Sequence, residues 1–236
     1  MVFSIEHQLE LPNNFPADDM VAFMASARQV LLNPTMSEAW KEFGGASNLI
    51  GWRFRSSYED MNNYIESWRK FGSNTSFEEM YLRERALFGM FTAGVSCIES
   101  TCYALNALVS HPNLLNMQFG ENEQRNCNPV RLKERLSKHS RARGLTNTLK
   151  ILTASTDWSL WIELRNRMTH RSNLPRITRV AIGSEPPPEK ALQFAATSST
   201  QAFEVDIEHL GIMFNWLANS LRQLLVEGKK FADYKD

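Results

Sequence analysis

The segment with the clearest chemical potential is Arg165-Asn166-x-x-x-His170. An arginine guanidinium can hold a phosphate through two parallel hydrogen bonds and can stabilise negative charge that develops on it. A histidine, whose ordinary pKa is about 6.5, can accept or donate a proton near neutral pH. The segment therefore combines an anion-binding group with a proton-transfer group, and Asn166 adds a polar side chain directly beside the arginine.

A helical pattern places these three side chains on two faces. On an α-helix Asn166 and His170 are four residues apart and share a face, whereas Arg165 lies about 140° around the axis from His170. One chain does not easily bring such a pair together. Two copies that meet about a two-fold axis bring two arginines and two histidines into one cleft, so the spacing favours a homodimer with a composite site.

The charge around this segment is strongly positive although the whole chain is neutral. The 236 residues carry 26 basic and 26 acidic side chains. Residues 131–179 contain twelve Lys or Arg and three Asp or Glu, which gives this basic window a charge of +9 and leaves −9 for the rest of the chain. Such asymmetry indicates an anionic partner near the window, or an internal contact with the acidic part of the chain.

These residues resemble the hallmark of the HEPN superfamily (higher eukaryotes and prokaryotes nucleotide-binding). That hallmark is an arginine, four to six residues and then a histidine, often with a polar residue directly after the arginine. Here Asn166 follows Arg165, and His170 stands at the end of a predicted helix late in a helical chain. The resemblance covers residues 75–227, and the motif itself is six residues long.

The resemblance implies a metal-independent endoribonuclease that acts as a dimer and needs no cofactor, as in toxin–antitoxin, abortive-infection and CRISPR-associated systems. In such an enzyme the 2′-hydroxyl of the RNA attacks the adjacent phosphate. The resemblance implies that His170 transfers protons, that Arg165 holds the phosphate, and that Asn166 orients the phosphate or the histidine. Neighbouring cations are then expected to contact the RNA backbone, namely Arg167, Arg171, Arg141 and Arg143.

One position departs from a pattern seen in part of the superfamily. Some of its nuclease toxins carry a tyrosine two residues after the histidine, which a partner antitoxin adenylylates. Ser172 occupies that position here, so we do not expect this form of neutralisation. An antitoxin or another defence-system protein stays among the expected partners, together with RNA.

Several other kinds of site are disfavoured by the sequence. No Gly-Lys-Ser/Thr follows Gly44-Gly45, so the pattern of a phosphate-binding glycine loop is missing. The five histidines are isolated, without the spacing that places two imidazoles on one helical face, and we expect no metal site. The sequence also lacks the Gly-x-Ser-x-Gly pattern of a serine hydrolase.

The sequence shows no membrane or export signal. Its longest uncharged apolar stretch, residues 86–98, has 13 residues, fewer than the roughly 18 that suggest a membrane span. The first residues lack the basic start and apolar core of a signal peptide. Three cysteines without a Cys-x-x-Cys pair are typical of reduced thiols. We therefore expect a cytoplasmic protein without a membrane anchor.

Helix starts and stops along the chain must position the candidate segment. The strongest helix is predicted over residues 75–110, because Thr75 and Ser76 each precede a glutamate by three residues, as in a capping box, and an apolar stripe follows. Further helices are expected over 16–32, 129–143, 146–154 and 206–227, over 37–70 with an interruption at Gly44-Gly45, and from Thr156 to the candidate segment. A polar loop is expected over residues 113–128, and two extended stretches, 176–182 and 192–197, predict a small hairpin.

We thus predict a mainly α protein, an HEPN-like helical bundle with a small β-hairpin-like insertion before the last helix. Residues 1–74 are expected to form an N-terminal helical extension packed on the core. Residues 75–232 form the expected bundle, with the insertion at about 176–200. Residues 233–236 match the start of a common epitope tag, and we assign them no role.

Less specific interpretations remain open. His170 could simply be a histidine favoured by the C-terminal end of a helix dipole, and the basic residues of 131–143 could be a solvated helix face. Trp158 and Trp161 are more typical of a core or an interface than of base stacking. Glu99, in the most apolar helix, is either a buried partner of an arginine near the site or a surface residue. The alternative function is an HEPN-like module that binds RNA, a nucleotide or a protein without cleavage.

Overall fold

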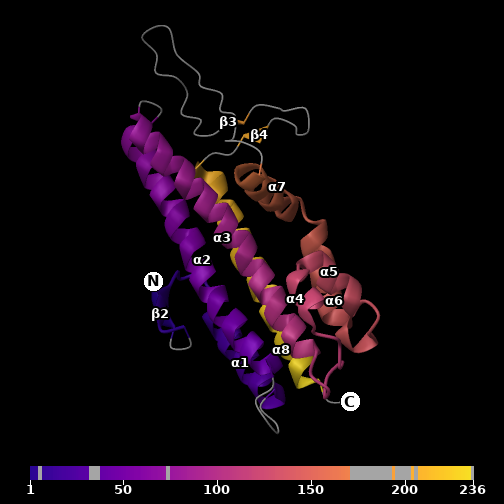
Figure 1. The fold of residues 1–236 in the computed structure, drawn as a ribbon. Coiled ribbons are helices and arrows are strands. Elements are labelled where there is room, and N and C mark those ends of the chain that lie inside the picture. Colours follow the sequence, from indigo (N-terminus) through magenta and orange to yellow (C-terminus); the bar gives the residue numbers. More distant parts are fainter. Residues whose placement is uncertain are drawn as a thin grey trace.

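The structure, a computed structural model, describes residues 1–4, 7–31, 38–72, 75–170, 193–194, 203–204 and 207–234. Over these residues the protein is mainly α-helical, as predicted. Three long helices run side by side, with a shorter one against the last of them (Figure 1): α2 (Glu38–Phe71), α3 (Phe77–Val109) and α8 (Ile207–Asp233), with α1 (Ala17–Leu31) on α8. The prediction of a helical bundle is therefore confirmed, whereas membership of the HEPN superfamily stays a prediction.

Helix α3 forms the centre of the bundle and begins where its capping residues predict. The hydroxyl of Ser76 accepts a hydrogen bond from the backbone N of Glu79 at 3.2 Å, and Glu78 and Glu79 place negative charge in the first turn. The predicted apolar stripe is buried throughout: Leu87, Met90, Phe91, Gly94, Ile98, Thr101, Leu105 and Leu108. Since α3 contacts α2, α5, α7 and α8, it is the element against which the candidate site is positioned.

Helix α2 is continuous, and the interruption predicted at Gly44-Gly45 is wrong. A Cβ atom placed on either glycine would meet no neighbouring atom within 4 Å, so both face open space. Glycine costs a helix interior about 1 kcal/mol relative to alanine, which the packing of α2 along α3 offsets. Phe43 and Ile50, on either side of the glycines, are fully buried and hold the helix to the core.

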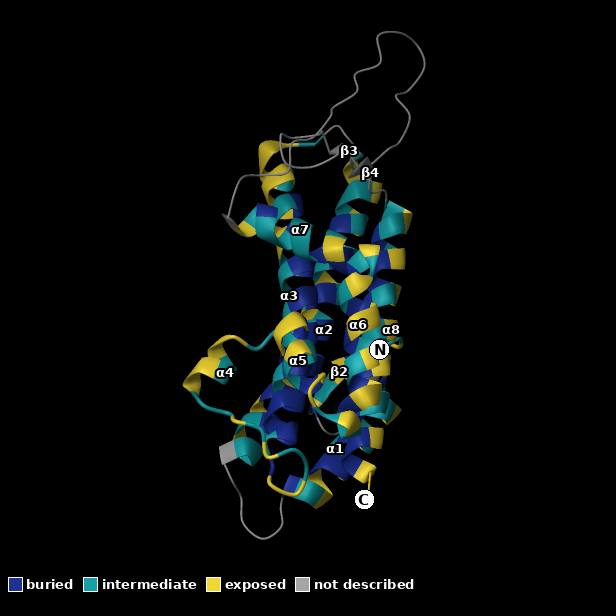
Figure 2. Cartoon of the chain, turned by 90° about the vertical axis from the view of Figure 1, so that its right-hand side faces the viewer, coloured by how far each residue is buried: buried dark blue, intermediate teal, exposed yellow. Residues whose placement is uncertain are grey.

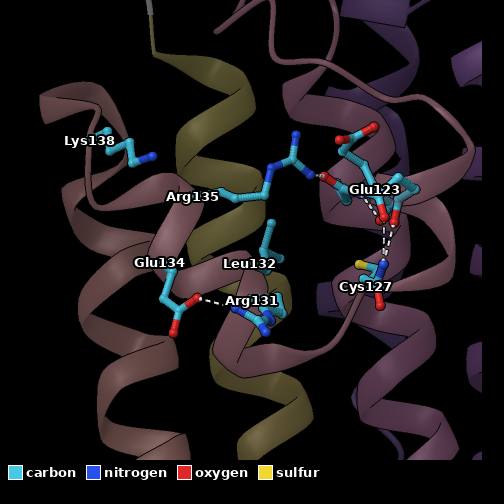
Figure 3. A pocket seen from close by; sticks show the side chains of 10 residues that line it. Glu123, Cys127, Arg131, Leu132, Glu134, Arg135 and Lys138 are labelled. Carbon is cyan, nitrogen blue, oxygen red and sulfur yellow. Dashed lines mark hydrogen bonds and ion pairs between the residues drawn. The ribbon is translucent and has the colours of Figure 1, made fainter.

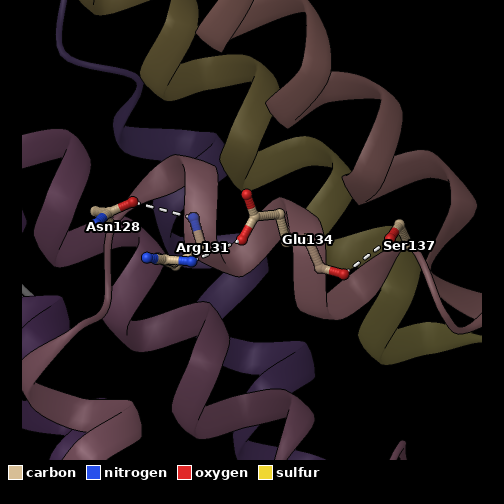
Figure 4. Close-up of polar contacts among 4 residues, drawn as sticks. All are labelled: Asn128, Arg131, Glu134 and Ser137. Carbon is tan, nitrogen blue, oxygen red and sulfur yellow. Dashed lines mark hydrogen bonds and ion pairs between the residues drawn. The ribbon is translucent and has the colours of Figure 1, made fainter.

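Residues 129–154 form more helices than their sequence pattern predicts. The side chain of Asn128 caps α5 (Pro129–Leu136) by accepting a hydrogen bond from the backbone N of Arg131 at 3.0 Å (Figure 4). The helix ends at Leu136 rather than at residue 143, since the chain must turn to bury Leu145 against the same core as Leu136. A 3-10 turn, η1 (Ser140–Ala142), makes that turn into α6 (Arg143–Ala154), and a short helix, α4 (Glu121–Arg125), lies within the predicted loop.

Helix α8 extends past residue 227, where its end was predicted, and continues through Gly228. A Cβ atom on Gly228 would lie 2.7 Å from the ring of Phe23 and 2.9 Å from Leu105, so only glycine lets α8 approach α1 and α3 this closely. Beyond it, Phe231 and Ala232 are buried and continue the apolar face. The glycine therefore marks a close helix contact rather than a helix end.

Two short hairpins accompany the helices. At the N-terminus β1 (Val2–Ser4) pairs antiparallel with β2 (Leu9–Leu11), which the sequence pattern does not predict. Before α8, β3 (Gln193–Phe194) pairs with β4 (Phe203–Glu204), so a hairpin is present in the region where one was expected. Within the predicted strand 192–197 the structure describes β3, but the partner of β3 is β4, where no strand was predicted. The predicted strand at 176–182 lies outside the described residues.

One cluster of buried apolar side chains joins the N-terminal helices to the rest of the described chain. In Figure 2 buried positions, coloured dark blue, occur along α1, α2 and α3 alike. It includes Phe23 of α1 and Phe54 of α2 together with Phe91 and Phe214 from α3 and α8. The boundary predicted at residues 74–75 falls between α2 and α3, which pack against each other. Among the described helices, none is both long enough and apolar enough to span a membrane.

Candidate functional site

The candidate segment lies on α7 (Thr156–His170), which packs on α3 through Trp161, while Trp158 lies near Trp216 of α8. Trp158 and Trp161 are 7 % and 1 % exposed, so both are core residues rather than base-stacking platforms. Trp161 meets Phe91 edge to face, with ring centroids 5.1 Å apart, and its ring lies directly over Gly94. A small residue at position 94 therefore allows α7 to lie close to α3. This contact determines where the candidate segment lies along the axis of α3.

Arg165 reaches from α7 to a carboxylate on α3. Its Nη2 atom lies 3.6 Å from Oε1 of Glu99, and the two side chains are 27 % and 30 % exposed. Glu99 is thus the partner of an arginine near the site, as one interpretation expected, but its side chain is partly exposed and not buried. The Nε atom of Arg165 is buried and has no acceptor among the described residues, so the guanidinium keeps unused hydrogen-bonding capacity.

Glu99 lies between arginines from two helices. Burial raises the pKa of its carboxyl group above the ordinary value, while Arg165 and, to a lesser extent, Arg53 of α2 lower it. Arg53 is itself fixed to α3, since its Nη1 donates to the carbonyl of Ser96 at 3.0 Å and to the hydroxyl of Ser100. The carboxylate therefore pairs with α7 and lies within the electrostatic influence of an arginine of α2.

The remaining residues of the motif are placed less completely. Asn166 is partly exposed beside Arg165, and the backbone of His170 closes α7. The side chain of His170, and the whole of Arg171 and Ser172, lie outside the described residues. The roles expected of His170 and Arg171, and the expected meeting of two copies, remain predictions.

Arg167 was expected to contact RNA at the surface, but its side chain is buried. Its side chain is 5 % exposed, and its Nε donates to Oε1 of Glu163 at 2.9 Å, one helical turn earlier. Charged side chains are buried in this way when a partner compensates their desolvation. The guanidinium of Arg167 therefore lies inside the protein, paired with Glu163 of the same helix, and not on the surface that a backbone contact requires.

Arg141 and Arg143 lie at another part of the bundle. Arg141 donates to the carbonyl of Tyr234 at 2.6 Å and lies over the rings of Phe231 and Tyr234, at the C-terminal end of α8. Arg143 is exposed at the start of α6. Arg141 also contacts the carbonyls of Asn113 and Leu114, which follow the end of α3. That end lies roughly 15 Å from Glu99 along the helix, at 1.5 Å per residue.

The basic window is consequently divided among several places instead of forming one surface. Arg131 pairs with Glu134 at 3.2 Å within α5. Arg135 donates to Oδ1 of Asn106 at 2.5 Å and to the carbonyl of Gln118, which fixes the loop before α4. These cations line a cavity of about 550 Å³ between α5 and the segment that carries α4 (Figure 3).

A different cavity adjoins the contact between Arg165 and Glu99. It has a volume of about 430 Å³ and lies between α2 and α3, with one wall from the segment before α5. Its lining combines charged, aromatic and apolar side chains: Glu42, Gly45, Ala46, Leu49, Arg53, Glu99, Ser100, Tyr103 and Cys127. Sequence reasoning missed this cavity because three distant segments build it, and only the isolated acid Glu99 marks it in the sequence.

Within the described residues, no group of three or more His, Cys, Asp or Glu side chains is arranged to hold a metal ion. Comparisons of the chain with models of protein families, with curated proteins and with solved structures find no match.

Proposed function

We propose that this protein is a metal-independent endoribonuclease of HEPN type, with an active site built from Arg165, Asn166 and His170 of two copies. The observation that carries the proposal is the position of Arg165. It stands five residues before His170 near the end of α7, and its side chain is 27 % exposed, with a contact of 3.6 Å to Glu99. A phosphate oxygen is the kind of acceptor that such a guanidinium binds.

The chemistry needs only groups that this segment supplies. The 2′-hydroxyl of one nucleotide attacks the adjacent phosphorus, so that the 2′-O–P bond forms while the bond from phosphorus to the 5′-oxygen of the next nucleotide breaks. His170 of one copy takes the proton of the 2′-hydroxyl, and His170 of the other gives a proton to the leaving 5′-oxygen. Arg165 stabilises the charge on the phosphate, and the products are a 2′,3′-cyclic phosphate and a free 5′-hydroxyl.

Asn166 shares a helical face with His170 and serves to orient that imidazole or the phosphate. Arg143 and Arg171 are proposed contacts for the RNA backbone. The guanidinium groups of Arg141 and Arg167 are bonded within the protein, so these two residues stabilise the fold and are not proposed as the main RNA contacts. The biological setting that fits such an enzyme is a toxin or a phage-defence effector that a partner protein restrains.

The test is cleavage of varied single-stranded RNAs by the purified protein in the presence of EDTA. We expect cleavage by the wild type, products with a cyclic phosphate, and a loss of about 100-fold or more in His170→Ala and Arg165→Ala, since each removes a group that acts in the transition state. Intact RNA with the wild type, or unchanged cleavage by His170→Ala, contradicts the proposal. Salt-sensitive binding that His170→Ala retains, with no product from either protein, indicates the binding module instead.

A further inference from the structure

The cavity beside Glu99 has the size and the composition of a small-ligand site. Its volume of about 430 Å³ falls within the range of about 300–1,000 Å³ that is typical of such sites. Leu49 and Tyr103 give it an apolar and an aromatic wall, and carboxylates enter from both long helices, Glu42 from α2 and Glu99 from α3. An aromatic wall with a few fixed polar groups is a common arrangement for a flat ring.

The two carboxylates keep hydrogen-bonding capacity toward a ligand. Oε2 of Glu42 accepts a hydrogen bond from the hydroxyl of Tyr103 at 2.8 Å, and Oε1 of Glu99 contacts Arg165. Each carboxylate has a second oxygen to which the described residues give no partner. Since an ionised carboxylate has about four acceptor positions, the cavity is rich in acceptors.

Several donors around the cavity are engaged with the protein or neutral. Burial, followed by the hydrogen bond to Glu42, raises the pKa of the Tyr103 hydroxyl, so that it stays protonated and donates to Glu42. Burial likewise raises the pKa of the Cys127 thiol to about 12, which keeps it neutral. Nη1 of Arg53 gives hydrogen bonds to Ser96 and Ser100. The two carboxylates therefore favour a ligand that supplies N–H donors to their free oxygens.

Among the four bases of RNA, guanine matches this demand best. Its Watson–Crick edge presents the N1–H and N2–H groups side by side, which are two adjacent donors for carboxylate oxygens. Adenine and cytosine each present one amino group beside an acceptor nitrogen, and uracil presents one N–H between two carbonyl oxygens. A metal ion is a poorer match, because Arg53 and Arg165 already place positive charge beside the carboxylate of Glu99.

We infer that this cavity binds the base of a guanine nucleotide of the RNA, with Glu42 and Glu99 accepting from its Watson–Crick edge and Tyr103 against its ring. The inference rests on the proposed function, because it places that guanine next to the phosphate held by Arg165. Proteins that recognise single-stranded RNA commonly read bases that are splayed out and stacked on aromatic side chains. The specificity pocket and the phosphate-binding group then share Glu99.

The test measures binding without cleavage. Two short 2′-O-methyl oligonucleotides, all uridine and the same sequence with one guanosine, are titrated with the full chain and followed by fluorescence anisotropy. The methyl group blocks the attacking hydroxyl, so the result does not depend on catalysis. We expect the guanosine-containing strand to bind about 10-fold more tightly or better, since a good bidentate contact to a base discriminates by roughly 10- to 100-fold.

Glu42→Ala is expected to reduce this preference to about two-fold or less, because one of the two carboxylates is lost. Glu78→Ala, which removes an exposed carboxylate of α3 outside the cavity, is the matched control and is expected to keep the wild-type preference. Equal affinity of the wild type for both strands, no binding of either strand, or equal preferences in the two variants overturns the inference. Cleavage of RNA without guanine preference overturns it while leaving the proposed function intact.

Discussion

Nη2 of Arg165 and Oε1 of Glu99 lie 3.6 Å apart, and this contact fixes the motif arginine to the central helix of the bundle. The contact is not explained by stability. Burial raises the pKa of Glu99 above its ordinary value even though two arginines lower it, so desolvation costs the carboxylate more than the arginines return. An ion pair of this kind is retained more readily for a positional role, which here is to hold the guanidinium of Arg165 at the candidate site.

Loss of this carboxylate should therefore reduce RNA cleavage more than it reduces stability. In Glu99→Gln we expect cleavage to fall about 10- to 100-fold, since a small displacement of a catalytic group has effects of this size. The free energy of unfolding should change by less than about 1 kcal/mol, because the pair is partly exposed. Cleavage rates and urea unfolding curves measure the two effects.

A double-variant cycle with Arg165→Ala separates a positional role from a direct one. If Glu99 acts through Arg165, adding Glu99→Gln to Arg165→Ala causes little further loss. Additive losses would show that Glu99 acts independently of the arginine.

The pH dependence of stability provides a second test of the Glu99 environment. Its carboxyl group has a pKa that burial raises above 4.5, the ordinary value, so the folded state binds a proton more strongly than the unfolded state does. The resulting stabilisation is fully present below pH 4.5 and is lost as the pH rises through the folded pKa. Relative to Glu99→Gln, the wild type should thus lose unfolding free energy over the window just above pH 4.5. Urea unfolding at a series of pH values checks this, and a relative gain with rising pH would contradict it.

Local sequence patterns predict those features, such as helix starts, that depend only on residues close together in the chain. Ser76 caps α3 and Asn128 caps α5 because a cap needs only a side-chain oxygen and the next backbone N–H groups. The positions of the cations are a different matter. Arg167 points into the protein and Arg141 onto the end of α8, because tertiary packing decides which side of a helix is covered. A count of charge along the chain cannot contain that information.

Gly228 shows the same limit for helix ends. In sequence, a glycine after an apolar helix predicts a C-terminal cap. In the structure the absence of a Cβ atom at this position serves contact with Phe23 and Leu105, which lie far away in the chain. The residue type is informative in both cases, but only the fold decides between the two meanings.

This difference can be measured with two glycines of the same helix. Gly228→Ala should reduce the free energy of unfolding by about 1–3 kcal/mol, because its methyl group would meet the Phe23 ring and Leu105 at under 3 Å. Gly211→Ala has no atom within 4 Å of the new methyl group and should stabilise by up to about 1 kcal/mol. Thermal and urea unfolding give both values. Equal effects would mean that Gly228 is not a close-packing position.

Substitution of two arginines of the basic window should affect different properties, stability in one case and RNA binding in the other. Arg141→Ala removes hydrogen bonds to backbone carbonyls and contacts with two aromatic rings, so we expect a loss of about 1–2 kcal/mol in unfolding free energy. Arg143→Ala changes an exposed side chain and should leave stability within about 0.5 kcal/mol. As a proposed phosphate contact, it should weaken RNA binding and lower the salt slope by about 1. Anisotropy titrations over a range of salt concentrations, beside unfolding curves, distinguish the two, and an unchanged salt slope would remove Arg143 from the proposed contacts.

The packing of Trp161 on Gly94 links the fold to the candidate site, and a methyl group at position 94 tests that link. In Gly94→Ala the new Cβ atom would lie 2.3 Å from Cζ3 of Trp161, a buried ring atom that cannot move without shifting α7. Since Arg165 follows Trp161 by one helical turn, such a shift would draw its guanidinium away from Glu99. We expect a loss of about 1–3 kcal/mol in stability and of about 10- to 100-fold in RNA cleavage.

A smaller ring should restore part of both losses, because Gly94→Ala combined with Trp161→Phe leaves room for the methyl group. Gly44→Ala on α2, where the new Cβ atom meets nothing within 4 Å, is the control and should keep wild-type cleavage. Wild-type cleavage by a folded Gly94→Ala would show that the site does not depend on how closely α7 approaches α3. Recovery in the double variant, measured by cleavage and by unfolding together, would instead connect a single glycine of the central helix to the position of the motif arginine.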